Sequence, residues 1–269
     1  MNVFRRGSNF SRQIEAIRAQ THKVHEIFVW ENGADTSGSQ PGVKVMRSNE
    51  NLGVWARFAA ALNAETDFLW VIDDDTIPGT RWLENALATF QDYPGVIGSR
   101  GLRFQTPHSY TLYEEFGPNN PSHQVEQVDI VGHNWIFPRS WLAFFWSELS
   151  NRFEDPLAGE DIHLSFAVKK HLGLGTFVPP HPDSDQSVWG ELPDTKFDGK
   201  GSEAISQNPK SMRRFERAYA HYIAQGFMPM CIEGGAVDNR LLSAQAKLVS
   251  RFPYFSQRVA QRLGIRKRS

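Results

Sequence analysis

The segment at residues 67–79 constrains the fold of this chain more than any other stretch. Residues 68–72 form a short apolar run, rich in β-branched and aromatic side chains, which predicts a buried strand. Three consecutive carboxylates at 73–75 end the run, and a Pro-Gly pair then turns the chain. Ligands bind at the carboxyl ends of strands in open α/β sheets, and clustered aspartates suit Mg²⁺ or Mn²⁺ with bound phosphates. The alternative is a solvated turn whose acids cap the following helix.

The flanking sequence predicts strands that alternate with helices. Apolar runs predict strands at residues 2–4, 26–31, 43–45, 95–104, 125–137 and 174–178. Apolar side chains at helical spacing predict helices beginning at Ser8 or Ser11 and at residues 52–62, 80–90, 141–149 and 160–171. Residues 107–121 and 179–202 are predicted loops. The alternation predicts an α/β fold with a mostly parallel central sheet flanked by helices.

Length and composition fit a folded domain. The chain has 269 residues, 40% hydrophobic and 22% charged, which suits one large domain with an appendage and excludes disorder along the whole chain. The formal net charge of -1 gives no electrostatic case for nucleic-acid binding. A single cysteine, Cys231, excludes an intrachain disulfide and fits a reducing compartment. We see no membrane-spanning run and no signal peptide, so we expect a cytoplasmic protein.

A second acidic motif, Gly159-Glu160-Asp161, stands at the start of a predicted helix. Acids are common there because they cap the helix and complement its dipole. The functional interpretation is a general base that removes a proton from an acceptor hydroxyl. The residues alone do not divide the roles, and Glu160 could instead bind an acceptor.

His181 is flanked by prolines, which hold its backbone in an extended conformation. Imidazole is a good ligand for Mn²⁺-like ions. A histidine in a loop is also commonly a polar surface residue. Because an Asp-rich strand end is expected in the same fold, metal binding by His181 is a reasonable expectation.

Taken in chain order, these features resemble a GT-A glycosyltransferase of the family-2-like type. The resemblance covers about residues 2–192 and rests on Asp73-x-Asp75, the strand at Gly132-His133-Asn134-Trp135, the Gly-Glu-Asp helix start and the later histidine. It implies a Rossmann-like GT-A catalytic domain at residues 1–205 and a small C-terminal helical extension at 206–269. It also implies an enzyme that moves a hexosyl or deoxyhexosyl group from a nucleotide-diphosphate sugar to a hydroxyl of a glycan, polysaccharide or glycolipid.

The resemblance implies roles for individual residues. Asp75, with Asp73 and His181, is expected to bind the Mn²⁺ or Mg²⁺ that bridges the donor diphosphate. Asp161, beside Glu160, is expected to be the base of an inverting reaction. Contacts to the nucleotide sugar are expected from Phe4, Arg5, Asn32, Asn51, Arg57, Asp73 and Asp74. His133, Trp135 and Trp189 are candidate platforms for the acceptor sugar, with core packing as the alternative for the tryptophans.

The expected chemistry agrees with these roles. A divalent ion would act as a Lewis acid on the departing diphosphate, while Asp161 deprotonates the attacking hydroxyl. The transition state would resemble an oxocarbenium ion, by analogy with glycoside hydrolysis. The loop at residues 179–202 would close over the donor and exclude water. Glu-Asp-Ile motifs also resemble those of some retaining enzymes, so the stereochemical outcome stays open.

Two other functions remain open. Phosphohydrolases of the haloacid-dehalogenase type use Asp-x-Asp at a strand end, but their nucleophile strand opens the fold, whereas the strand here is internal. A nucleotide-sugar- or carbohydrate-binding protein would keep the fold without turnover. The intact Asp73, Asp75 and Asp161 argue against that second alternative, and donor hydrolysis in Mn²⁺ would separate it from an enzyme.

Residues 206–269 carry the weakest signal. Apolar side chains recur there at helical spacing beside arginines, at Phe252, Phe255, Val259 and Leu263. An interfacial helix in peripheral contact with a membrane would suit a lipid-linked acceptor. The alternative is a helix that packs on the catalytic domain and ends in a solvated basic tail.

Overall fold

The computed structural model describes residues 1–3, 7–33, 40–193 and 209–232. These residues belong to one compact unit, Met1–Glu233. Within these ranges, no helix combines the length and the apolar composition needed to cross a bilayer. The predicted boundary after residue 205 lies outside the described residues, as do Phe4, Arg5 and the segment predicted to contact a membrane.

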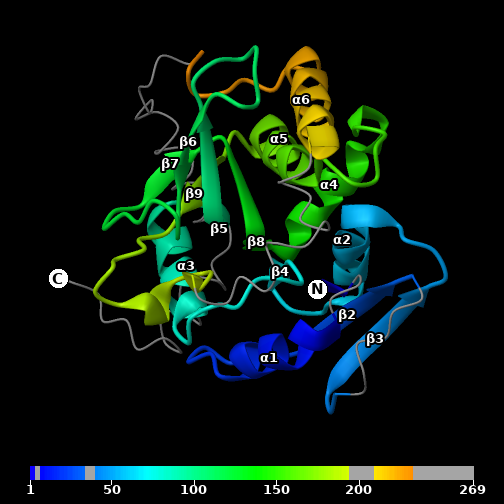
Figure 1. Cartoon of the computed structure of the whole chain (residues 1–269), viewed down its shortest axis with the longest axis vertical. Coiled ribbons are helices and arrows are strands. Elements are labelled where there is room, and N and C mark those ends of the chain that lie inside the picture. The colour runs from blue at the N-terminus through cyan, green and yellow to red at the C-terminus, as the bar shows by residue number, and fades with distance from the viewer. Residues whose placement is uncertain (4–6, 34–39, 194–208, 233–269) are drawn as a thin grey trace. The chain divides into compact units, whose positions relative to one another are not determined.

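A small parallel sheet stands at the N-terminal end of the chain. Strands β1 (Asn2–Val3), β2 (Ile27–Asn32) and β3 (Val43–Ser48) pair in that order. Helix α1 (Gly7–Arg18) connects β1 to β2 and lies alongside them (Figure 1). Its apolar side chains at helical spacing, Phe10, Ile14 and Ile17, join a buried cluster with Val29 of β2 and Ile72 of β4. This packing ties α1 to the strand that carries the aspartates.

The larger sheet has the order β4-β8-β5-β9-β7, and β6 pairs with β5 beside this path. Its strands are β4 (Phe68–Ile72), β5 (Gly95–Phe104), β6 (Tyr113–Phe116), β7 (Glu126–Val128), β8 (Ile130–Pro138) and β9 (Gly175–Val178). β9 is parallel to β5, whereas β8 is antiparallel to both β4 and β5. Strands β4, β5 and β9 therefore run in one direction, with β8 inserted the opposite way.

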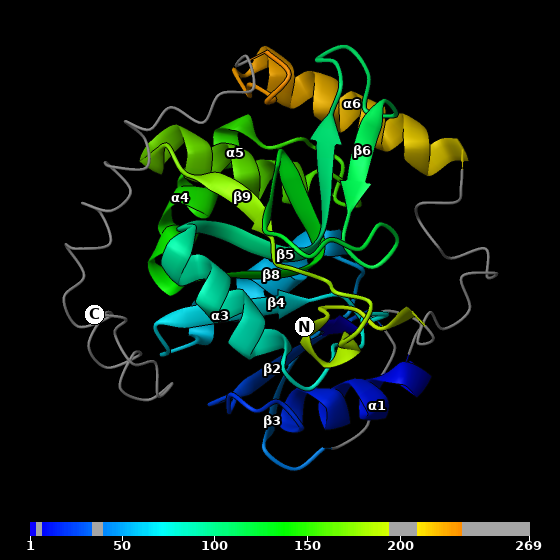
Figure 2. The same ribbon diagram turned by 90° about the vertical axis from the view of Figure 1, so that its left-hand side faces the viewer.

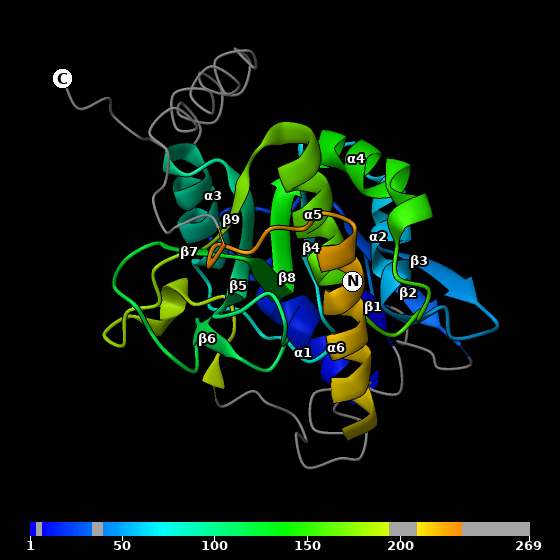
Figure 3. The ribbon, with the colours of Figure 1, turned by 90° about the horizontal axis from the view of Figure 1, so that it is seen from above.

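Helices cover the larger sheet. Helix α3 (Trp82–Asp92) packs against β5 (Figure 2), and α5 (Glu160–Leu172) packs against β5, β8 and β9. Helix α6 (Pro209–Ala224) lies next to α5 (Figure 3). The shorter helical turns are η1 (Gly53–Trp55), α2 (Ala56–Ala60), η2 (Ala61–Asn63), η3 (Arg139–Trp141), α4 (Leu142–Ser147), η4 (Leu149–Asn151) and η5 (Gln186–Val188).

The predicted α/β class, with parallel strands flanked by helices, is confirmed. Among the described strands of the larger sheet, however, only β5 and β9 pair in parallel. Three further details differ from the sequence prediction. The predicted loop at 107–121 contains strand β6. The predicted strand at 125–137 is two strands, β7 and β8, which pair with different neighbours. The predicted helix at 52–62 is three short turns rather than one continuous helix. Neighbour pairing depends on contacts distant in sequence, so no local pattern revealed these breaks.

Candidate functional site

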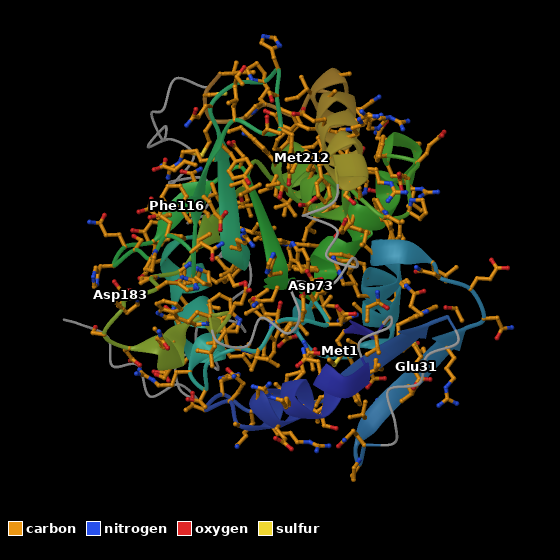
Figure 4. All side chains as sticks on the ribbon, viewed as in Figure 1. Met1, Glu31, Asp73, Phe116, Asp183 and Met212 are labelled. Carbon is orange, nitrogen blue, oxygen red and sulfur yellow. The ribbon has the colours of Figure 1, made fainter. Side chains whose placement is uncertain are left out.

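The three aspartates begin where β4 stops pairing with β8. The ladder ends at Ile72, and the amide of Asp73 then donates to the carbonyl of His133 at 2.9 Å. The chain turns at once, because the Thr76 amide donates to the Asp73 carbonyl at 3.3 Å. All three aspartates are partly exposed, and Figure 4 shows Asp73 at this strand end, beside α2. We call residues 73–76 the aspartate turn.

Buried amide side chains of α1 and of the residues just after it hold the backbone of this turn. Asn9, Gln13 and Gln20 are each buried, and all three donate hydrogen bonds to main-chain carbonyls in or just after the turn. The bonds run from Asn9 to Asp74, from Gln13 to Asp73 and Thr76, and from Gln20 to Gly79. Sequence analysis missed these residues, although Asn9 and Gln13, four residues apart, share one face of α1.

Arg57 joins the aspartate turn to the start of α5. This arginine of α2 is 6% exposed, and one guanidinium nitrogen, Nη1, pairs with Asp73 Oδ1. Its other nitrogen, Nη2, lies 2.5 Å from Glu160 Oε1. The guanidinium carbon stands 4.6 Å from the ring centroid of Trp135, a cation–π distance. Two acidic motifs that are far apart in the sequence therefore share one buried cation.

Helix α5 begins directly after Gly159, whose φ of 91° is a left-handed conformation that glycine adopts without strain. Glu160 is buried, and this burial raises its pKa even though the nearby Arg57 charge acts to lower it. Asp161 is partly exposed, and its Oδ1 accepts a hydrogen bond from the Ile162 amide at 2.7 Å. Loss of solvation raises the pKa of Asp161 to about 6, against the opposing effect of that hydrogen bond. A carboxyl with this pKa is mostly ionised at neutral pH.

His133 forms a second polar link at the aspartate turn. Its φ of 64° is left-handed, which is uncommon outside glycine. Its Nδ1 lies 2.8 Å from Oε2 of the buried Glu191, and its Nε2 lies 3.3 Å from Arg100 Nη1. Burial alone would lower the pKa of His133, but the Glu191 carboxylate outweighs burial and raises that pKa to about 9. No local motif marks Glu191 or Arg100, and the sequence analysis missed both.

Two residues predicted to contact the nucleotide shape a neighbouring turn. Asn32, at the end of β2, is 1% exposed and donates to Asn51 Oδ1 at 2.8 Å and to the Gly53 carbonyl at 3.0 Å. Its own Oδ1 accepts from the Leu52 amide at 2.7 Å. Asn51 is exposed. Asn32 therefore acts as a support for this turn, and of the two residues only Asn51 is accessible to a ligand.

Three predicted residues are buried in a way that contradicts their predicted roles. His181 is 0% exposed, and its Nδ1 lies 2.7 Å from the Pro179 carbonyl while its Nε2 accepts from the Gly190 amide at 3.3 Å. Neither nitrogen is available to a metal in this arrangement. Trp135 and Trp189 are 1% and 3% exposed, so neither ring offers a face for a sugar to stack on. Trp135 instead supports Arg57.

The donor set at the aspartate turn fits a divalent ion that arrives with phosphates. Within the described ranges, no three His, Cys, Asp or Glu side chains converge on a metal position. Ions that carry nucleotide phosphates commonly take only one or two protein carboxylates, and the phosphates complete the shell. Burial raises the pKa of Asp73 most, the Arg57 charge acts to lower it, and the charge of Asp75 raises it further. Adjacent oxygen donors of this kind suit Mn²⁺ or Mg²⁺.

Comparisons with known proteins complete the description of the site. A family model described as glycosyl transferase family 2 matches residues 1–152. Two structures of S. aureus TarS 1-349, one in complex with UDP, share 15% and 14% identity with this chain, at TM-scores of 0.42 and 0.44. Both matches cover 67% of this chain, which spans 57% and 56% of those two chains. No curated protein matches. The family match includes Arg57 and the aspartate turn and ends before α5.

Proposed function

The chain belongs to glycosyl transferase family 2, and on that premise we propose that it transfers a sugar from a nucleotide-diphosphate sugar to an acceptor hydroxyl. The observation that carries the proposal is the bridge made by Arg57, which contacts Asp73 after β4 and Glu160 at the start of α5. A donor diphosphate at the aspartate turn and an acceptor hydroxyl at α5 would meet at this bridge. The proposed donor carries a hexosyl or deoxyhexosyl group, and the proposed acceptor is a glycan or a lipid-linked sugar.

We assign the metal role to the aspartate turn. Asp75, together with Asp73, would hold Mn²⁺ or Mg²⁺. When bound, the cation neutralises charge that develops on the departing diphosphate. The amides of α1 support this assignment, because they fix the main chain that carries both carboxylates. The metal role predicted for His181 is not part of this proposal.

Asp161 is the proposed base. It is partly exposed at the start of a helix, where an acceptor could approach it. Its raised pKa gives the carboxylate a higher affinity for the proton of an attacking hydroxyl, while it stays mostly ionised at neutral pH. Glu160 is buried against Arg57 and is suited to hold that guanidinium in place. In-line attack with Asp161 as base would give an inverting reaction.

A thermal-shift screen of nucleotide sugars, with and without Mn²⁺, tests the proposal. At a ligand concentration of about 100 times Kd, binding adds about 2.7 kcal/mol of stability, which corresponds to a rise in Tm of roughly 5–10 °C for a domain of this size. We expect Asp75→Asn to abolish the Mn²⁺-dependent part of the shift. Asp92→Asn is the matched control, because Asp92 is exposed at the end of α3.

Release of nucleoside diphosphate from the sugar that gives the largest shift then separates an enzyme from a binding protein. We expect Mn²⁺-dependent release that Asp161→Asn reduces by about 10²–10⁴-fold, the usual contribution of a general base. A shift without any release would indicate a binding protein. No shift with any nucleotide sugar, or a shift unchanged in Asp75→Asn, would contradict the assignment of the donor site.

A further inference from the structure

His133 is the non-glycine residue with positive φ within the described ranges. A left-handed backbone is unfavourable for a residue with a Cβ atom, so surrounding contacts must hold it there. Conformations of this kind cluster at functional sites. The two neighbours of His133, Gly132 and Asn134, have no such conformation, so the reversal is confined to one residue of β8.

This conformation directs the main-chain carbonyl of His133 toward the aspartate turn. The His133 oxygen accepts the Asp73 amide at 2.9 Å and the Thr76 hydroxyl at 3.4 Å. These donors stand at the two ends of the aspartate turn. The backbone carbonyl of His133 therefore contacts both ends of the turn.

Glu191 holds the ring of His133. The Glu191 carboxylate is 4% exposed and lies 2.8 Å from His133 Nδ1. On the other side of the ring, Arg100 is fixed by a pair with Glu115 at 2.8 Å. The next residue of β8 is also anchored, because Asn134 Nδ2 donates to the Gly190 carbonyl at 2.8 Å. Side-chain and main-chain contacts thus join β8 to residues 190–191.

The segment that carries Glu191 is itself fixed to the chain after the aspartate turn. The Leu192 amide donates to the Ile77 carbonyl at 2.9 Å, and the Gly79 amide donates to the Trp189 carbonyl at 2.9 Å. The Arg81 amide donates to the Ser187 carbonyl at 2.7 Å. Residues 187–192 therefore run along residues 77–81 and bring Glu191 to His133 from a fixed position.

We propose that Glu191 is a positioning residue that acts through His133. By holding the imidazole, it keeps His133 in the left-handed conformation whose carbonyl shapes the aspartate turn for a metal-bound diphosphate. The identity of what the turn binds rests on the proposed function. The mechanical link from Glu191 to the turn does not.

Two measurements test this link. Hydrogen exchange of the Asp73 amide reports the shape of the turn without any ligand, and titration with Mn²⁺ and UDP as the probe reports its binding. We expect Glu191→Ala to speed exchange of this amide and to weaken Mn²⁺–UDP binding, each by about tenfold, the scale set by releasing one strained backbone conformation. Glu191→Gln keeps an oxygen that can accept from the imidazole, so its effects on exchange and binding should be smaller than those of Glu191→Ala. If Glu191→Ala does not fold, Glu191→Gln carries the same test.

Variants at position 133 separate positioning from direct contact. Glycine adopts positive φ freely and alanine does not. We therefore expect the Asp73 amide to exchange more slowly in His133→Gly than in His133→Ala, and Mn²⁺–UDP to bind more tightly. Adding Glu191→Ala to His133→Gly should then leave Asp73 exchange and Mn²⁺–UDP binding unchanged, because Glu191 acts through an imidazole that the glycine variant lacks. Equal losses in the glycine and alanine variants, or a full additional loss in the double variant, would overturn the proposal.

A structural control completes the design. Glu126→Ala removes another carboxylate of the larger sheet, one that pairs with Arg103 at 3.1 Å. It should lower Tm without changing Asp73 exchange or Mn²⁺–UDP binding. Unchanged Asp73 exchange in a folded Glu191 variant would refute the link. Failure of the wild type to bind Mn²⁺–UDP would count against the proposed function and leave the exchange result to decide the link.

Discussion

Replacing Arg57 by methionine removes the buried cation that joins the two acidic motifs. Methionine fills much of the same volume over Trp135 but carries no charge. The change leaves the carboxylates of Asp73 and Glu160 without the cation that both contact. It also removes a cation–π contact at 4.6 Å. Stability should therefore fall through electrostatics rather than through a cavity.

The magnitude follows from burial. Removing one partner of a buried ion pair typically costs about 3–5 kcal/mol. Asp73 is 23% exposed at its side chain and water relieves part of its charge, while the Glu160 side chain is only 10% exposed. Glu160 already has a raised pKa, so at neutral pH it can take up a proton instead of remaining an unpaired anion. We therefore expect a loss at the lower end of the range, about 3 kcal/mol at pH 8.

The pH dependence gives the sharper signature. Without Arg57, the folded-state pKa of Glu160 moves further above its unfolded value, because Arg57 is the charge that lowers it. Such a carboxyl binds its proton more tightly in the folded state, so its contribution to stability is lost as pH rises. The deficit of Arg57→Met relative to wild type should therefore stay nearly constant below about pH 7 and should grow as pH rises through about 8, where Glu160 ionises in the folded wild type.

Urea unfolding at several pH values measures this deficit. Arg103→Met is the matched control, because Arg103 also pairs with two carboxylates, Glu114 and Glu126, and lies 4.4 Å from the ring centroid of Phe116. Its side chain is 31% exposed, so its loss should cost less than about 1 kcal/mol. A deficit for Arg57→Met that equals the control, or that does not change with pH, would refute the reasoning.

Glu148 and Gly190 supply two further tests. Despite its burial, Glu148 has a pKa lowered to about 2 by Lys170, Asn151 and His171, so Glu148→Gln should cost about 1–3 kcal/mol at pH 7. Because the folded pKa is depressed, the difference in urea unfolding should shrink as pH falls from about 4.5 toward 2; a constant difference would contradict the assignment. A Cβ atom at Gly190 would lie 2.3 Å from Ser99 Cβ, so Gly190→Ala should lower stability by about 1–3 kcal/mol, whereas Gly132→Ala, with nothing within 4 Å, should be near neutral. Equal Tm values for these two glycine variants would show that the packing around Gly190 is looser than described.

Local signals in the sequence predicted the two elements that carry the candidate site. An apolar run that ends in carboxylates predicted β4 and the aspartate turn, and strand and residues agree with the structure. Gly-Glu-Asp predicted the start of α5 at Glu160. Both signals depend only on neighbouring residues, which is why a single sequence was sufficient.

Contacts between distant segments could not be predicted in this way. Asp129 illustrates the point, because it lies between β7 and β8 and its carboxylate accepts hydrogen bonds from the amides of Phe104 and Met230, each at 2.7 Å. In the sequence it is one of several polar residues in the predicted strand at 125–137. Glu191 likewise stands in a loop-like segment, and only the fold brings it to His133.

Burial misled the sequence analysis at three aromatic positions. Trp135, Trp189 and His181 are residue types that bind sugars or metals when exposed. Prolines and glycines around His181 and Trp189 indicated a loop, whereas Trp135 lay in a predicted strand. In the structure, residues 179–193 pack tightly enough that His181 lies against the rings of Trp82 and Trp189. Aromatic residues serve cores as readily as binding sites, and the pattern alone does not distinguish the two.

The central claim is that the aspartate turn and the start of α5 form one site for a metal-bound nucleoside diphosphate. A crystal structure of the protein soaked with Mn²⁺ and UDP, with the metal located by its anomalous scattering, measures this most directly. We predict an anomalous peak for a manganese ion that both Asp75 and the diphosphate oxygens coordinate, with Asp161 facing the same space. A manganese ion bound elsewhere, or a diphosphate remote from Arg57, Asp73 and Glu160, would contradict the account.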